Sequence, residues 1–211
     1  MKVTKYEHAT LLLSIGDDSL VIDPGMFLSA VDFGNVAAII ITHEHGDHWT
    51  PDQLGRILDK NPNAVIYGTE GVKAAASGFE VHAVKEGDTI EAGPFTLRFY
   101  GDKHAVIHES VPVPDNVGVL VNDELYYAGD SFVAPENVAV GTLAVPAGAP
   151  WLKISEVMDY VDAVAPKRSF AVHEMLLSDA GKSMSNDRIT TATEWHDGRF
   201  VPLAPGESLE L

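Results

Sequence analysis

Four side chains that can bind a metal ion, His43, His45, Asp47 and His48, lie within six residues of one another. Imidazole nitrogens and carboxylate oxygens hold zinc and similar divalent cations at roughly 2.0–2.2 Å. In an extended segment, residues two apart point the same way, so His43 and His45 can close on one ion. Gly46 lets the backbone turn, after which Asp47 and His48 can face a second position. Three of the nine histidines fall in this segment, which favours a metal site over a polar loop with scattered histidines.

The element that must position these side chains is the apolar run that precedes them. Val36–Ile41 is too short for a typical helix and is rich in β-branched residues. A short, continuous apolar run of this kind is typical of a strand that is buried on both faces. The sequence therefore predicts a buried strand that ends at the metal-binding segment.

The pattern His43-x-His45-x-Asp47-His48 at the end of an isoleucine-rich strand resembles the signature of the metallo-β-lactamase superfamily. The resemblance implies an α/β fold, the four-layer αβ/βα sandwich, in which two sheets lie back to back with helices outside. The motif is specific for the superfamily and says little about the substrate.

Three later residues match the remaining ligand positions of the superfamily, and each follows a predicted strand: His104, Asp130 and His173. The resemblance implies two neighbouring metal positions, with one carboxylate that spans them. The first metal is held by His43, His45 and His104, the second by Asp47, His48 and His173, and Asp130 bridges both. Asp23, at the end of an earlier strand, matches the residue that supports the site from behind; the alternative is a turn aspartate before proline.

No Ser-His-Asp or Cys-His arrangement is evident, so we expect water to be the nucleophile. Metal coordination lowers the pKa of bound water from 15.7 to about 7. The hypothesis is that a metal-bound hydroxide attacks an ester, lactone, amide or phosphoester. The expected cofactors are one or two divalent ions, with zinc favoured and manganese or iron as alternatives. Asp47 and Asp130 are expected to be catalytic as well as metal-binding. His108 is the alternative to His104 as a metal ligand, and we expect it instead to contact the substrate or transfer a proton.

Four functions follow from this site. We favour a hydrolase acting on a small-molecule ester or lactone, with a phosphodiesterase as the alternative. Di-iron redox chemistry and a non-catalytic metal-binding module rank lower. The segment His104–His108 and the N-terminal segment around His8 resemble most the compact lactonase-like branch of the superfamily, which includes ascorbate-6-phosphate lactonases. In the N-terminal motif of that branch a glycine precedes the histidine, whereas this chain has Glu7 before His8. We expect His8 to lie beside the metal ligands without being one of them.

Composition bounds the remaining possibilities. The 211 residues suit one domain, 1–211, and 31 acidic against 14 basic residues give a net charge of −17 without a basic cluster. Such a surface repels nucleic acids and anionic membranes, which leaves a small molecule as the expected partner and homo-oligomerisation open. Without cysteine, disulfides and thiolate ligands are excluded. The first residues lack the apolar core of a signal peptide, so a cytoplasmic location is expected.

Strands and helices alternate in the first and last thirds of the predicted pattern, and strands alone occupy the middle. A hairpin is expected over 11–23, helices over 51–60, 70–76, 154–164 and 186–195, and a second sheet beginning within 85–128. Residues in loops after the strands are expected at the rim of the pocket, although ordinary packing explains them equally well: Trp49, His108, Ser131, Phe132 and Trp151.

Overall fold

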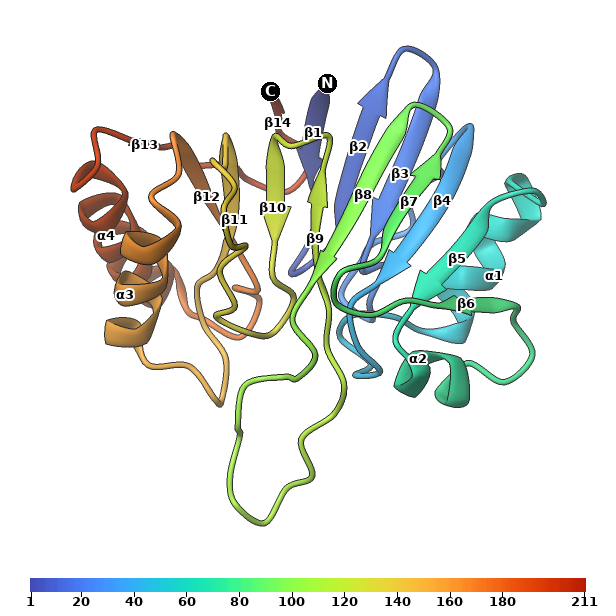
Figure 1. Ribbon diagram of the computed structural model, residues 1–211, viewed down its shortest axis with the longest axis horizontal. Helices are drawn as coiled ribbons and strands as arrows, with labels where there is room; N and C mark the ends of the chain where they lie inside the picture. Colours follow the sequence, from blue (N-terminus) through green and yellow to red (C-terminus); the bar gives the residue numbers. More distant parts are fainter.

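Two seven-stranded β-sheets pack face to face in this protein (Figure 1). The computed structural model describes all 211 residues. In spatial order, the first sheet contains β14 (Ser208–Glu210), β1 (Lys2–Lys5), β2 (Leu11–Ile15), β3 (Asp18–Ile22), β4 (Val36–Ile41), β5 (Val65–Gly68) and β6 (Val81–Ala83). The second contains β13 (Arg199–Phe200), β12 (Arg168–Val172), β11 (Thr142–Pro146), β10 (Leu125–Tyr127), β9 (Gly118–Val121), β8 (Phe95–Tyr100) and β7 (Thr89–Ala92).

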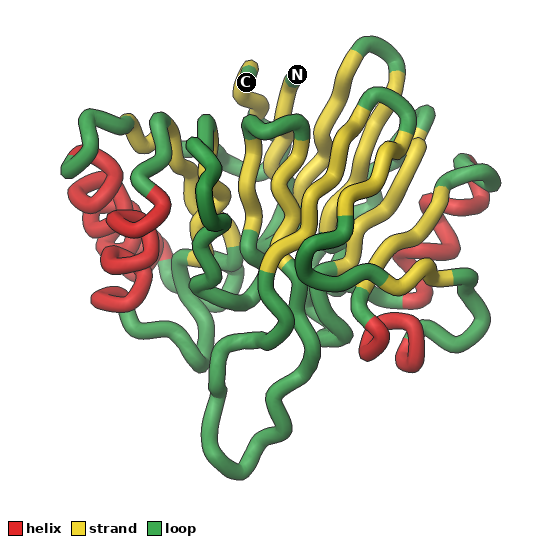
Figure 2. Tube along the Cα trace, viewed as in Figure 1, coloured by secondary structure: helices red, strands yellow, loops and turns green.

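Two helices lie against the outer face of each sheet, red in Figure 2. The first sheet is covered by α1 (Pro51–Lys60) and α2 (Glu70–Ala75), and the second by α3 (Ile154–Val164) and α4 (Asp179–Glu194). This arrangement confirms the predicted four-layer αβ/βα sandwich. None of the four helices combines the length and the apolar character that crossing a bilayer requires.

The apolar strand β4 illustrates why the layers form. Its side chains alternate between two hydrophobic clusters: Ala38 and Ile40 face the other sheet, whereas Ile39 and Ile41 pack with α1 and its surroundings. Because both faces of the strand are covered, its sequence is continuously apolar rather than alternating. A third cluster fills the space between the second sheet and α3 and α4.

The functional edge of the sandwich is where the parallel strands of both sheets end. Strands β3 to β6 are parallel to one another, as are β10 to β13. Their carboxyl ends open into the loops at the lower edge of Figure 1, from which residues 101–117 project as a long loop. Ligands converging from several strand ends are thus placed by rigid elements.

Two elements differ from the sequence-based expectation. Strand β1 was not predicted, because its buried Lys5 reads as a surface residue until it is paired with Glu174. Helix α4 begins at Asp179 rather than at Asn186, with Ser178 accepting a hydrogen bond from the Gly181 N–H group as its N-cap. No residue in its first half is buried, so hydrophobic periodicity could not reveal that half.

Candidate metal centre

The predicted ligands meet at the functional edge in two adjacent groups of side chains. In each group the potential ligand atoms lie within 4.8 Å of one another. One group contains His43, His45, His104 and Asp130, and the other His8, Asp47, His48 and His173. The structure therefore brings together all seven residues that the sequence analysis proposed as ligands, although ligation itself stays a prediction.

Asp130 lies between the two groups and faces both. Its Oδ1 is 3.2 Å from Nε2 of His48, while its Oδ2 is 3.3 Å from Nε2 of His104 and 3.1 Å from Nε2 of His173. A carboxylate placed in this way can offer one oxygen to each of two cations, which in such sites lie about 3.5–4 Å apart.

Four buried polar atoms at this centre have no hydrogen-bond partner. They are Nε2 of His48, Nε2 of His104, Nε2 of His173 and Oδ1 of Asp130. Buried polar atoms in folded proteins are nearly always hydrogen-bonded, so such a concentration in one place requires an explanation. Divalent cations would satisfy all four atoms, and imidazole and carboxylate are suitable donors for zinc. The residues present therefore fit a metal centre.

In four of the candidate histidine ligands the outward-facing Nδ1 is occupied, which leaves Nε2 for the centre, whereas in His45 it is Nδ1 that faces inward, 3.0 Å from Nε2 of His43. The Nδ1 partners are Thr42 Oγ1 for His43 (3.1 Å), Asp23 Oδ2 for His48 (2.6 Å), Ala105 O for His104 (2.5 Å) and Gly148 O for His173 (2.8 Å). A proton on Nδ1 leaves the Nε2 lone pair free, and such outer contacts fix the orientation of metal-binding imidazoles.

Asp23 supports the centre from behind, at the position that the resemblance implies. It is fully buried just after β3, and its Oδ1 accepts a hydrogen bond from the Thr42 N–H group at 2.8 Å. Its Oδ2 accepts hydrogen bonds from the Thr42 hydroxyl at 2.7 Å and from Nδ1 of His48 at 2.6 Å. One carboxylate thus positions both the end of β4 and one of the candidate ligands.

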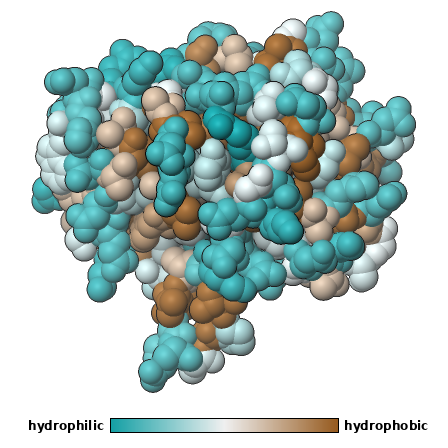
Figure 3. Space-filling view, in the orientation of Figure 1, coloured by the Kyte–Doolittle hydropathy of each residue, from teal (hydrophilic) through white to brown (hydrophobic).

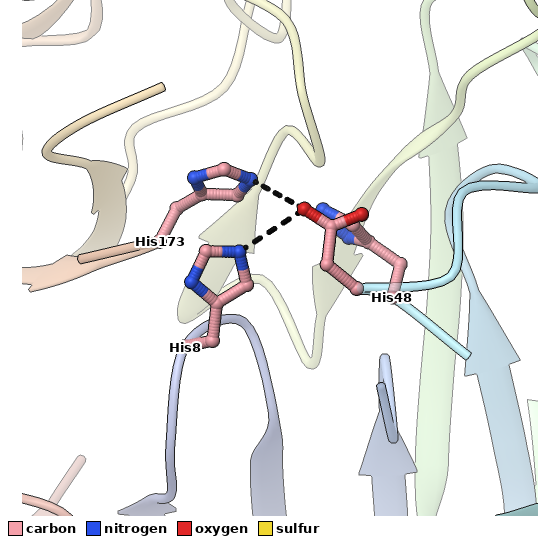
Figure 4. A group of neighbouring side chains, drawn as sticks. His8, His48 and His173 are labelled. Atoms are coloured by element: carbon pink, nitrogen blue, oxygen red, sulfur yellow. Dashed lines mark hydrogen bonds and ion pairs between the residues drawn. The ribbon is translucent and has the colours of Figure 1, made fainter. Parts of the chain in front are cut away.

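His8 lies beside His173 and His48 in the second group (Figure 4), and it also contacts Asp47. The Met175 N–H group donates to Nδ1 of His8 at 3.3 Å, which places the ring proton on Nε2. That proton points to Oδ2 of Asp47 at 3.2 Å, and the same oxygen lies 3.4 Å from Nε2 of His173. His8 is therefore placed to orient Asp47, and that it is not itself a ligand stays a prediction.

Gly129 explains why a glycine precedes Asp130. Its backbone is in the left-handed region (φ 64°), and a Cβ atom there would lie 2.4 Å from Oδ1 of Asn116. Asn116 is fully buried, and its Oδ1 accepts a hydrogen bond from the Asp130 N–H group at 3.0 Å. Sequence reasoning missed Asn116, because an asparagine in a long loop carries no signal of burial.

The residues expected at the pocket rim differ in their exposure and in their contacts. Trp49 and Ser131 are buried and donate hydrogen bonds to backbone carbonyl groups, which favours the alternative of ordinary packing for both. Phe132 packs on Trp151 with ring centroids 5.3 Å apart, and Trp151 donates a hydrogen bond to Asp130. His108 is exposed in the long loop, bonds to Ser110 and belongs to neither group of ligands; its catalytic role stays a prediction.

The charges of the centre are arranged around its two carboxylates. Burial alone raises the pKa of Asp130, but the nearby His48 and His173 bring it well below its usual range. The neighbouring His173 and His8 imidazoles likewise hold the pKa of Asp47 far below its usual range, against the effect of burial. Burial lowers the pKa of His173, yet Asp130 raises it to about 9. Both carboxylates are thus ionised at neutral pH. A cation that binds at the second group must displace the proton from His173.

Comparisons with known proteins identify related families and folds. A family model described as a beta-lactamase superfamily domain matches residues 2–173. Over 199 residues the chain is 37% identical to protein Rv0786c of Mycobacterium tuberculosis, covering 92% of this chain and 93% of that protein. It is 29% identical over 148 residues to a UPF0173 metal-dependent hydrolase of Flavobacterium johnsoniae, covering 62% of each chain. The fold superposes with a TM-score of 0.75 and 17% identity on Igni18, a metallo hydrolase from Ignicoccus hospitalis, covering 100% of this chain and 98% of that chain.

Proposed function

Because the chain belongs to the metallo-β-lactamase superfamily, we propose that it is a metal-dependent hydrolase that cleaves an ester or lactone bond of a small molecule. The observation that carries the proposal is the pair of buried ligand groups with the Asp130 carboxylate between them. When bound there, divalent cations would lower the pKa of a coordinated water and polarise a carbonyl group. We further propose zinc as the metal, and the compact lactonase-like branch as the nearest part of the superfamily.

The ligand groups would divide between two cations. His43, His45 and His104 would hold the first, and Asp47, His48 and His173 the second, with Asp130 shared. His45 and Asp47 are the two candidate ligands that are partly exposed, whereas the others are buried. A substrate therefore approaches the centre from the side of these two residues.

Asp47 is the residue best placed to handle a proton. Its side chain is 25% exposed, and the hydrogen bond from His8 together with the nearby His173 keeps it ionised. An ionised carboxylate at the open side of the centre can orient an attacking water and accept its proton. His8 fixes this carboxylate in place, because its own ring is held by the Met175 N–H group.

The charges around the centre favour a neutral substrate over a phosphodiester. A phosphate group is usually recognised by arginine or lysine side chains. Only one such residue, Lys103, occurs in the ligand-bearing loops, and its Nζ lies 2.6 Å from Oδ1 of Asp115. These loops are residues 42–50, 101–117, 128–141 and 173–178. A carbonyl compound without a negative charge meets no repulsion from this acidic surface.

The test is an assay of metal-reconstituted protein on matched substrates. Protein treated with a chelator and reloaded with zinc or manganese is given 4-nitrophenyl acetate, γ-butyrolactone and bis(4-nitrophenyl) phosphate. We expect kcat/KM for the ester or the lactone to exceed that for the diester at least a hundredfold, and chelation to abolish turnover. Faster cleavage of the diester would establish the phosphodiesterase instead, and a metal-loaded protein inert on all three would favour a non-catalytic module.

A further inference from the structure

Large apolar side chains are exposed mainly around the metal centre. Ten large hydrophobic residues of the chain are exposed, and seven of them lie in three loops at the functional edge. These seven form what we name the apolar rim: Met26 after β3, Val106, Ile107, Val111 and Val113 in the long loop, and Met175 and Leu176 after β12. Single exposed apolar residues are ordinary, whereas a cluster of them marks a binding surface.

Each loop of the apolar rim is joined to the metal centre by a hydrogen bond that a backbone N–H group donates. The N–H group of Met26 donates to Gly46 O at 2.9 Å, within the metal-binding motif. The N–H group of Ala105, which precedes Val106, donates to Asp130 O at 2.8 Å. The third part is attached through Met175, whose N–H group donates to Nδ1 of His8. The three loops that carry the apolar side chains are therefore each attached at the metal centre.

The long loop provides the most prominent part of the rim. It projects beyond the rest of the molecule in Figure 1, and brown apolar side chains gather along it in Figure 3, with teal polar side chains at its end. Its base is fixed by hydrogen bonds from the His104 N–H group to Pro114 O and from the Asn116 N–H group to Asp102 O. Exposed Val106, 63% accessible, thus rises from a base that also positions His104.

We propose that the apolar rim binds a hydrocarbon chain on the substrate, so that the enzyme acts on uncharged esters or lactones with an extended acyl group. This inference rests on the proposed hydrolase function and adds the substrate class. The charge pattern supports it, because the ligand-bearing loops contain a single lysine and no arginine, and that lysine, Lys103, is paired with Asp115. Each methylene group that is fully buried against such a surface strengthens binding about fourfold.

A second copy of the chain is the rival occupant of the apolar rim. The continuity of the rim with the ligand loops favours the substrate, since every part of the rim is bonded to a residue at the centre. A substrate chain also needs only a few side chains, whereas a stable interface between proteins buries about 800 Å² on each partner.

The experiment measures how hydrolysis depends on acyl length. Zinc-loaded protein is assayed with 4-nitrophenyl acetate, butyrate and octanoate, each rate being corrected for the spontaneous reactivity of the ester. We expect kcat/KM to rise at least tenfold from acetate to octanoate. The double variant Val106→Ser with Leu176→Ser should reduce the octanoate-to-acetate ratio at least fivefold. Met184→Ser, which changes an equally exposed residue on α4, is the control and should keep the wild-type ratio.

The outcomes separate the inference from the proposed function. Absence of acetate, lactone and octanoate hydrolysis by metal-loaded protein would refute the hydrolase itself. Acetate hydrolysis with a flat or falling dependence on chain length would overturn the inference while the hydrolase stands. Sedimentation velocity tests whether a second copy of the chain occupies the rim. If the wild type is a dimer, and the double variant is a monomer with an unchanged octanoate-to-acetate ratio, the rim is an interface between copies. That result would also overturn the inference.

Discussion

Nε1 of Trp151 lies 3.1 Å from Oδ2 of Asp130, and both side chains are buried. The indole therefore donates a hydrogen bond to the carboxylate that stands between the two ligand groups. Because this bond restrains rotation of the carboxylate, Oδ1 stays directed at His48 while Oδ2 faces His104 and His173. Outer contacts of this kind determine how well a ligand is presented to a metal.

Trp151→Phe should weaken metal binding without unfolding the protein. The phenyl ring keeps most of the packing against Phe132 and His104 but removes the N–H donor. We expect metal affinity or kcat to fall about 10–100-fold, as is typical when an outer contact of a ligand is lost. Competition with a chromogenic chelator gives the affinity. Trp195→Phe, at a half-exposed tryptophan, is the matched control and should leave it unchanged.

Asp130→Asn should remove the bridge between the two groups. The amide preserves the shape of the side chain but presents one oxygen and loses the negative charge that faces His48 and His173. At least one equivalent of metal should be lost by elemental analysis, with turnover reduced more than about a hundredfold. As the control, Asp102→Asn makes the same chemical change at an exposed position of the long loop 101–117. Wild-type metal content in the Asp130 variant would contradict the bridging assignment.

Asp23→Asn should act on His48 from behind the centre. Both oxygens of Asp23 accept hydrogen bonds, so either orientation of the amide sets its NH₂ group against the Thr42 or the His48 donors. A buried donor left without an acceptor costs about 1–3 kcal/mol of stability. We also expect a 10–100-fold loss of affinity for one metal, because His48 loses its fixed tautomer. Urea unfolding and metal titration measure the two effects, with Asp17→Asn in the exposed turn as control. Unchanged values for both would refute the supporting role of Asp23.

The pH dependence of metal binding should follow His173. Its pKa is raised from 6.5 to about 9, chiefly because Asp130 outweighs the effect of burial. In chelator-treated protein, the stability contributed by protonated His173 is fully present below pH 6.5 and is lost as the pH rises through 9. Metal affinity changes in the opposite direction, since the proton must leave before a cation binds.

We therefore expect the difference in Tm between zinc-loaded and chelator-treated protein to increase from pH 6.5 to 9. Differential scanning calorimetry at several pH values measures it, and His173→Gln should weaken the dependence. A constant difference across this range would show that no proton is displaced from the ligands.

Local sequence was sufficient to predict most elements around the site. The β-branched run Val36–Ile41 and the Thr50 cap before Pro51 carry their structural meaning in a few neighbouring residues. The local sequence of strand β1 and of the first half of α4 gave no such signal. In β1 the charge of Lys5 is neutralised by the distant Glu174, and the start of α4 contacts solvent. Burial of a polar residue depends on a partner that pattern reasoning cannot see.

The sequence by itself determined the residue types of the centre and, through strands that end in His43, Asp130 and His173, the edge where they gather. Only the tertiary structure decided which atoms face inward, because Nδ1 of His48 bonds to the Asp23 carboxylate and Nδ1 of His173 to the Gly148 carbonyl group, both from other parts of the chain. It also decided the outer roles of His8, Asn116 and Trp151. Hydrogen bonds act over about 3 Å in space regardless of distance along the chain, so contacts of this kind exist only once the layers have packed.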